Sequence, residues 1–114
     1  MATLHCGGQP LPIGFTNQFL AHLQVATAAR FGQGKGFFLT MTGENADGTE
    51  TTWSNWLHPG IPLSFHYDVR DDSDNRVAPV KLDHDEINAI TAAMDEPNGV
   101  RGNDGVWWPF SEPL

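Results

Sequence analysis

The sequence predicts an α+β fold in two layers, in which a mainly antiparallel sheet of four to six strands packs against two helices. Two observations carry this prediction. Two separate stretches repeat apolar residues every three or four positions, as helices do, and the stretch between them alternates apolar and polar residues with the period of two typical of strands. The 114 residues suffice for one hydrophobic core, so we expect a single domain over residues 1–114.

The chain begins with a segment that favours strands and continues into a helix. Residues 1–15 hold short apolar stretches interrupted by a Gly-Gly pair and two prolines, which is typical of a small hairpin or of two edge strands. The apolar residues that follow have helical spacing, with Thr16 or Asn17 as the N-terminal cap and Gly32 as the stop. We therefore expect the first helix over residues 16–32.

Residues 37–69 are expected to form three consecutive strands of an antiparallel meander. If a tight hairpin closes around Pro59 and Gly60, the second and third strands pair with Trp53 facing His66. His58 then joins Trp56 on the apolar face of the sheet. A wider loop would change this register, because an L-Pro-Gly pair prefers a type II turn.

The second helix has a marked start after the acidic loop RDDSDNR. Asp83 is the expected cap, Glu86 lies three residues later as in a capping box, and Leu82 is placed to contact Ile87. An apolar stripe follows, and Pro97 and Gly99 end the helix. Residues 98–114 form a turn-rich tail that carries three large aromatic side chains. We expect it to be docked on the domain, because exposed aromatic clusters invite association; the aromatic residues are Trp107, Trp108 and Phe110.

Charge and cysteine content restrict the partners and the compartment. The formal net charge is −8, from six basic and fourteen acidic residues, so binding to nucleic acid phosphates is not expected. The single cysteine, Cys6, forms no intrachain disulfide, and the N-terminus lacks the features of a secretory signal. No apolar run is long enough to span a bilayer. We expect a cytoplasmic protein that binds a protein partner or a second copy of itself.

Catalytic and metal-binding patterns are incomplete. Ser64, His66 and Asp68 have the composition of a hydrolase triad, but they follow one another along one strand, whereas a triad needs hydrogen-bond contact from nucleophile to base to acid. His58 and His66 point to opposite faces in the expected register, so they hold no common metal ion. We expect no metal and no cofactor.

The segments LAHLQVATAARF, GKGFFLT and TTWSNWLHPGIPLSF resemble a family of short, uncharacterised bacterial proteins that carry LAHLQ on a helix and WLHP-x-IPL in the same order. The resemblance covers approximately residues 13–67. Members are often labelled ATP-dependent DNA ligase, yet neither KGFF nor KLDH in this chain matches the K-x-D-G motif in which such ligases form their lysyl adenylate. The resemblance implies a shared site or a shared core; its matched residues are His22, Trp56, His58 and Pro59.

Three functions follow from these observations. The leading hypothesis is a non-catalytic binding or regulatory module that uses an aromatic sheet face or the tail, with Trp53, His66 and the three tail aromatics as binding residues. The second is a small hydrolase or metal-dependent enzyme centred on His58 or His66. The third is an auxiliary role in nucleotide or DNA metabolism, which depends on the family label alone.

Overall fold

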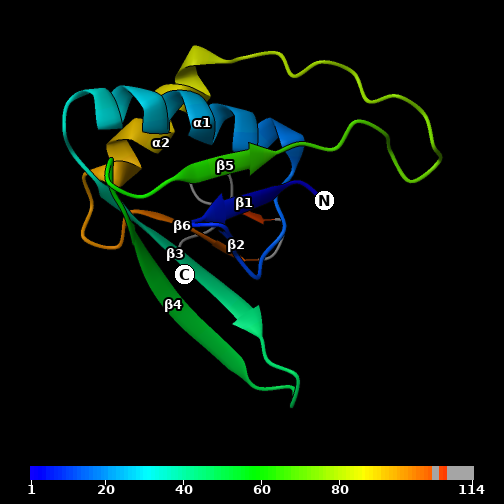
Figure 1. Ribbon diagram of the computed structural model, residues 1–114, viewed down its shortest axis with the longest axis horizontal. Coiled ribbons are helices and arrows are strands. Elements are labelled where there is room, and N and C mark those ends of the chain that lie inside the picture. Colours follow the sequence, from blue (N-terminus) through cyan, green and yellow to red (C-terminus); the bar gives the residue numbers. More distant parts are fainter. Residues whose placement is uncertain (104–105, 108–114) are drawn as a thin grey trace.

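The predicted two-layer α+β architecture is confirmed, with the strands divided between two sheets. The computed structural model describes residues 1–103, 106 and 107, with only the backbone for 103, 106 and 107. The sheets have the strand orders β2-β1-β5 and β4-β3-β6-β7 (Figure 1). The elements are β1 (Thr3–Cys6), β2 (Gln9–Pro10), α1 (Asn17–Gly32), β3 (Phe37–Glu44), β4 (Glu50–Leu57), β5 (Leu63–His66), α2 (His84–Met94), β6 (Val100–Asn103) and β7 (Val106–Trp107).

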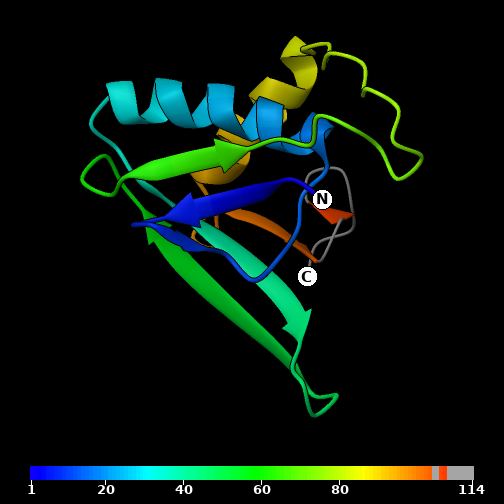
Figure 2. The same ribbon diagram turned by 45° about the vertical axis from the view of Figure 1, so that its right-hand side comes forward.

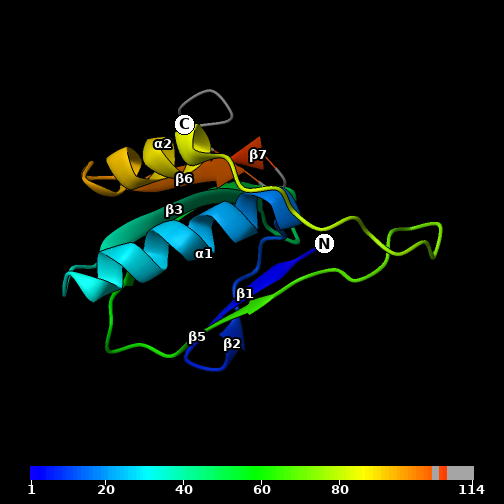
Figure 3. The same ribbon diagram turned by 90° about the horizontal axis from the view of Figure 1, so that it is seen from above.

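Both helices lie on one side of the molecule, above the strands (Figures 1 and 3). The three-stranded sheet passes in front of the four-stranded one, and the β3–β4 hairpin extends away from the helices (Figure 2). One core joins the helices to both sheets, because both helices and the strands β1, β3, β4, β5 and β6 contribute apolar side chains to the space between them. Its largest fully buried members are Leu4, Phe15, Leu20, Leu23, Phe37, Leu39, Met41, Leu57, Ile90 and Val100.

Helix α1 begins and ends where its sequence predicts. The Thr16 hydroxyl accepts a hydrogen bond from the Phe19 backbone N–H at 3.1 Å, which satisfies one of the free donors of the first turn. Gly32 is the last helical residue. The buried face follows the helical period, so α1 packs one stripe against the core and leaves the other in solvent; the buried stripe is Phe19, Leu20, His22, Leu23, Ala26 and Thr27.

The four-stranded sheet combines a hairpin with a parallel strand. Strands β3 and β4 pair antiparallel, with Phe38 opposite Trp56, and β6 runs parallel to β3 with Val100 beside Leu39. The chain reaches β6 through Gly99, whose φ of +65° favours glycine. A Cβ atom at this position would lie 1.9 Å from the Phe38 carbonyl oxygen. The close approach of these two backbone segments therefore requires glycine.

The expected meander of three consecutive strands was wrong at its third strand. Strand β5 does not pair with β4. It pairs antiparallel with β1, with Thr3 opposite His66. The chain reverses at Pro59–Gly60, where the Ile61 N–H donates to the His58 carbonyl at 3.0 Å. Pro62 has no N–H to continue a ladder, and its carbonyl accepts from the Gly7 N–H at 2.9 Å. The first hairpin, β1–β2, forms as expected.

Helix α2 begins at the predicted cap but without the predicted capping box. The Asp83 carboxylate accepts from the Asp85 N–H at 2.8 Å. The Asp83 N–H donates to His22 Nε2 at 2.9 Å instead of to Glu86. The Glu86 carboxylate accepts from the Gln18 side chain at 3.0 Å. The His22 ring of α1 thus accepts the hydrogen bond that the Glu86 carboxylate would accept in a capping box. This bond joins the two helices.

Replacing Asp83 with alanine should lower the free energy of unfolding by about 1 kcal/mol, the usual contribution of an N-terminal cap. The Asp85→Ala variant is the matched control, because that carboxylate lies in the same first turn and its removal affects mainly the helix dipole, by a few tenths of a kcal/mol. Urea denaturation of the three proteins measures both changes. Equal midpoints for Asp83→Ala and the parent protein would contradict the capping role.

Candidate functional site

The structure separates Trp53 from His66, the two predicted binding residues whose side chains it describes. Trp53 lies on the inner face of the four-stranded sheet, where its ring packs on Gly43, and its cross-strand neighbour is Met41. His66 lies on the exposed face of the other sheet. The predicted Trp53–His66 pair was therefore wrong, because it required β5 to pair with β4. Trp107 contributes backbone to β7, which pairs with β6. The side chain of Trp107, and Trp108 and Phe110 altogether, lie outside the described residues.

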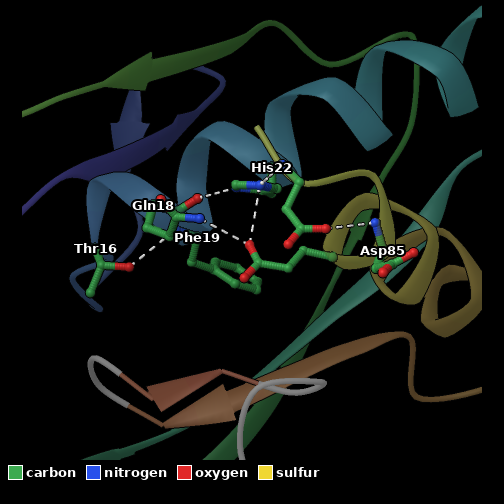
Figure 4. A network of polar contacts seen from close by, with 7 residues as sticks. Thr16, Gln18, Phe19, His22 and Asp85 are labelled. Carbon is green, nitrogen blue, oxygen red and sulfur yellow. Dashed lines mark hydrogen bonds and ion pairs between the residues drawn. The ribbon is translucent and has the colours of Figure 1, made fainter. Parts of the chain in front are cut away.

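His22 is a fully buried residue of the core. Its Nδ1 lies 2.6 Å from the Gln18 carbonyl, and its Nε2 accepts from the Asp83 N–H (Figure 4). These two bonds assign a neutral ring with the proton on Nδ1. Glu86 Oε2 lies 3.1 Å from Nε2, and this contact becomes an ion pair only if the ring gains a second proton. His22 thus links α1 to the start of α2.

His58 and Pro59 form a turn. His58 Nδ1 accepts from the Gly60 N–H at 3.1 Å, so the ring closes the reversal between β4 and β5. His58 and His66 lie on different elements and sheets, and the described residues contain no group of three histidine, cysteine or carboxylate side chains that could hold a metal ion. The His58 ring thus stabilises this turn.

Trp56 lies on the outer face of the sheet, which corrects its expected apolar placement. Its side chain is 49% exposed, and it contacts Phe38, which is 37% exposed, with ring centroids 4.9 Å apart. The ring also covers Gly36, where a Cβ atom would lie 2.8 Å from it. Trp53 and Trp56 cannot both face the core, because side chains alternate along a strand and these two positions differ by an odd number. The residues predicted from the sequence did not include Phe38, although the alternation along β3 places it on the face opposite to Phe37 and Leu39.

The exposed face of the three-stranded sheet holds two stacked histidines. The His5 and His66 rings lie 4.0 Å apart at 22° to each other. Ser64 Oγ lies 2.7 Å from His66 Nε2, a contact that the spacing along one strand had argued against. His5 Nε2 lies 3.3 Å from the Thr3 hydroxyl. This face therefore contains a serine and histidine pair in hydrogen-bond contact, on an open surface.

Cys6 is not activated as a nucleophile. It lies on the inner face of β1 opposite Leu63, and burial raises the pKa of its thiol. A raised pKa lowers the fraction of thiolate, which is the reactive form. Cys6 is therefore an apolar packing residue at the edge of the core.

A family model described as a domain of unknown function, DUF7882, matches residues 1–104 of this chain. No curated protein and no solved structure matches it. Over the part of the chain that the structure describes, neither helix has the length and apolar character needed to cross a membrane.

Proposed function

The chain belongs to the DUF7882 family, and we propose that it is a non-catalytic module that binds an extended segment of a partner protein beside β5. One observation carries the proposal: the outer edge of β5 is unpaired among the described residues, and an apolar groove separates it from α1. An open strand edge next to a groove is the arrangement that binds peptides by strand addition. The edge supplies backbone hydrogen bonds, and the groove accepts side chains.

The register of β5 defines which backbone groups face the open edge. The bond from the Gly7 N–H to the Pro62 carbonyl marks a hydrogen-bonded position between the first hairpin and β5. Because such positions alternate along an antiparallel pair, Ser64 and His66 turn their backbone groups toward β1. Leu63 and Phe65 therefore direct their N–H and C=O groups away from β1. These are the groups that would pair with a bound strand.

The groove presents apolar side chains from both walls. One face of α1 and one face of β5 enclose a volume of about 350 Å³, near the lower end of the range for ligand sites. The Tyr67 hydroxyl donates to Gln24 at 2.5 Å and bridges the two walls at one end; burial also raises the pKa of Tyr67. The lining residues are Gln24, Thr27, Ala28, Phe31, Ile61, Leu63 and Phe65.

Thr27 adds a polar group to this apolar lining. Its side chain is 3% exposed, and its hydroxyl has no hydrogen-bond partner among the described residues. A threonine in a helix has two accessible side-chain rotamers, so a rotation about Cα–Cβ brings the hydroxyl to the position of the methyl group. A bound segment with a polar group at this depth would satisfy it.

The charge of the chain favours a basic partner. The formal net charge is −8, and the connection that follows β5 carries Asp68, Asp71, Asp72 and Asp74. Complementary charge speeds association and orients the partner. A segment that adds antiparallel to β5 has its N-terminal end beside this acidic connection. We therefore expect a segment with basic residues first and alternating apolar residues after them.

A hydrolase is the second candidate, favoured by the 2.7 Å contact between Ser64 and His66. Among the described residues, no carboxylate is hydrogen-bonded to the His66 ring, and neither Ser64 nor His66 lines the groove between α1 and β5. Acyl transfer requires an oriented base and a substrate site next to the nucleophile. The peptide-binding function is therefore better supported.

A library of random twelve-residue peptides, displayed on phage and selected on the immobilised protein, tests the proposed function. The Ala28→Trp variant fills the groove, because Ala28 is exposed and lines it. Ala29→Trp is the matched control on a neighbouring exposed position outside the groove. We expect the selected peptides to carry basic residues before alternating apolar ones. Their affinity should fall at least about tenfold, or by about 1.4 kcal/mol, for Ala28→Trp and should stay unchanged for Ala29→Trp.

Two further outcomes bear on the proposal. N-methylation at alternate peptide positions should weaken binding, since it removes the backbone donors that strand addition requires. Peptides that bind Ala28→Trp as well as the parent protein would show that the groove is not the site. A selection that enriches no peptide would contradict the proposed function as a whole.

A further inference from the structure

The longest open strand edge of the described molecule belongs to β4. This strand pairs with β3 along its full length of eight residues and has no partner on its other side among the described residues. No described element lies beyond this edge (Figures 1 and 2). Natural proteins protect such an edge with lysine, proline, a bulge or a covering segment. The sequence of β4, ETTWSNWL, contains neither lysine nor proline.

Exposed aromatic side chains lie beside the same edge. Trp56 and Phe38 are in contact on the outer face of the hairpin, and both are more than one third exposed. A large aromatic side chain buries on the order of 150 to 250 Å² when packed. An unprotected edge with such a pair beside it is characteristic of an interaction surface.

We propose that two copies of this chain associate by antiparallel pairing of their β4 strands. The bond from the Asn45 N–H to the Thr49 carbonyl at 2.7 Å sets the alternation of the β3–β4 ladder. Thr52 and Ser54 therefore direct their backbone groups toward the open edge. A twofold axis through the centre of β4 places Thr52 of one copy opposite Ser54 of the other. The two four-stranded sheets then form one continuous sheet.

The charge distribution of β4 is compatible with this occupant. Glu50, at the first position, is the one charged residue of the strand. Antiparallel pairing places the two Glu50 side chains at opposite ends of the joined strands, so they do not repel each other. On the outer face, Glu50 of one copy lies opposite Trp56 of the other, and Thr52 lies on a diagonal to that ring. The second copy therefore covers part of the exposed aromatic pair.

The surface available sets the expected strength of association. One edge strand and two aromatic side chains per copy make a small interface, below roughly 1,200 Å² in total, which is the size of weak and transient complexes. The dimer should therefore depend on concentration. It uses an edge different from that of the proposed peptide groove, so each copy keeps its groove in the dimer.

Sedimentation equilibrium over a range of concentrations up to about 1 mM tests the proposal, because even a dimer with a millimolar dissociation constant is substantially populated there. We expect the mass to rise from 12.5 kDa toward twice that value. In Ser54→Pro the edge N–H is absent while the ladder to β3 is kept, so the variant should stay monomeric. Ser54→Ala is the matched control, since it removes the same hydroxyl, which lies 2.7 Å from that of Thr40, and keeps the N–H.

A second variant decides the question if Ser54→Pro does not fold. Thr52→Lys places two lysines on a close diagonal across the twofold axis and should also keep the protein monomeric. Amide exchange measured by NMR should show protection of the Thr52 and Ser54 N–H groups that increases with concentration. A protein that is monomeric over the whole range, or a dimer that persists in both folded variants, overturns the proposal.

Discussion

Replacement of Gly99 with alanine is expected to destabilise the domain by more than about 3 kcal/mol, which places it among the most damaging single substitutions. Two effects act together. A residue with a Cβ atom is strained by about 1–2 kcal/mol at a left-handed φ such as +65°. In addition, the new Cβ would lie 1.9 Å from the Phe38 carbonyl oxygen, so β6 must move away from β3. Urea denaturation followed by circular dichroism measures the change.

Gly34→Ala separates these two effects. Gly34 also has a left-handed φ, of +73°, but no atom lies within 4 Å of the position of its Cβ. Its substitution should therefore cost about 1–2 kcal/mol, from backbone strain alone. If Gly99→Ala and Gly34→Ala lower the stability equally, the parallel pairing of β3 and β6 does not depend on close approach at Gly99.

Replacement of His22 with leucine is expected to destabilise the domain by about 2–4 kcal/mol. Leucine is close to histidine in size, so the loss comes mainly from hydrogen bonding and not from a cavity. It removes the bonds that the fully buried His22 ring makes to the Gln18 carbonyl and to the Asp83 N–H, both of them part-buried contacts. Each buried group left unpaired costs about 1–3 kcal/mol. Because Asp83 caps α2, we also expect increased amide exchange in the first turn of that helix.

His58→Leu is the control for this prediction. His58 also accepts a backbone hydrogen bond, from Gly60, but in an exposed turn where water can replace it. We expect a loss below about 1 kcal/mol, as for other surface substitutions. Equal losses for the two variants, or an unchanged amide exchange in α2 for His22→Leu, would contradict the assignment of His22 as the link between the helices.

The candidate surfaces were only partly accessible to sequence analysis. The family resemblance selected Trp56, and the structure places it on an exposed face next to Phe38. The groove between α1 and β5 could not be found in this way, because its walls come from residues 24–31 and 61–65 and meet only through the pairing of β5 with β1. Periodicity identifies the face of each element, but it does not identify the neighbour of that face.

The sequence by itself determined the local structure. Thr16 and Asp83 specify the helix starts, because a cap is made by the side chain of one residue and the backbone of the next turn. The β3–β4 hairpin also forms within one continuous segment, and its alternation of apolar and polar residues predicts both strands. These features depend on residues a few positions apart, so they can be read without knowing the rest of the fold.

Only the tertiary structure decided which strands pair and which side chains are buried. Strand β5 has the same alternating pattern whether it pairs with β4 or with β1, and β1 lies about sixty residues earlier in the chain. That choice separates Trp53 from His66. Likewise, the pairing of β4 with β3 places Trp56 beside Phe38 on the outer face. The packing of α2 against α1 buries His22. The physical reason is that a strand pattern defines two faces and two edges, while the packing of distant segments determines which of them is covered.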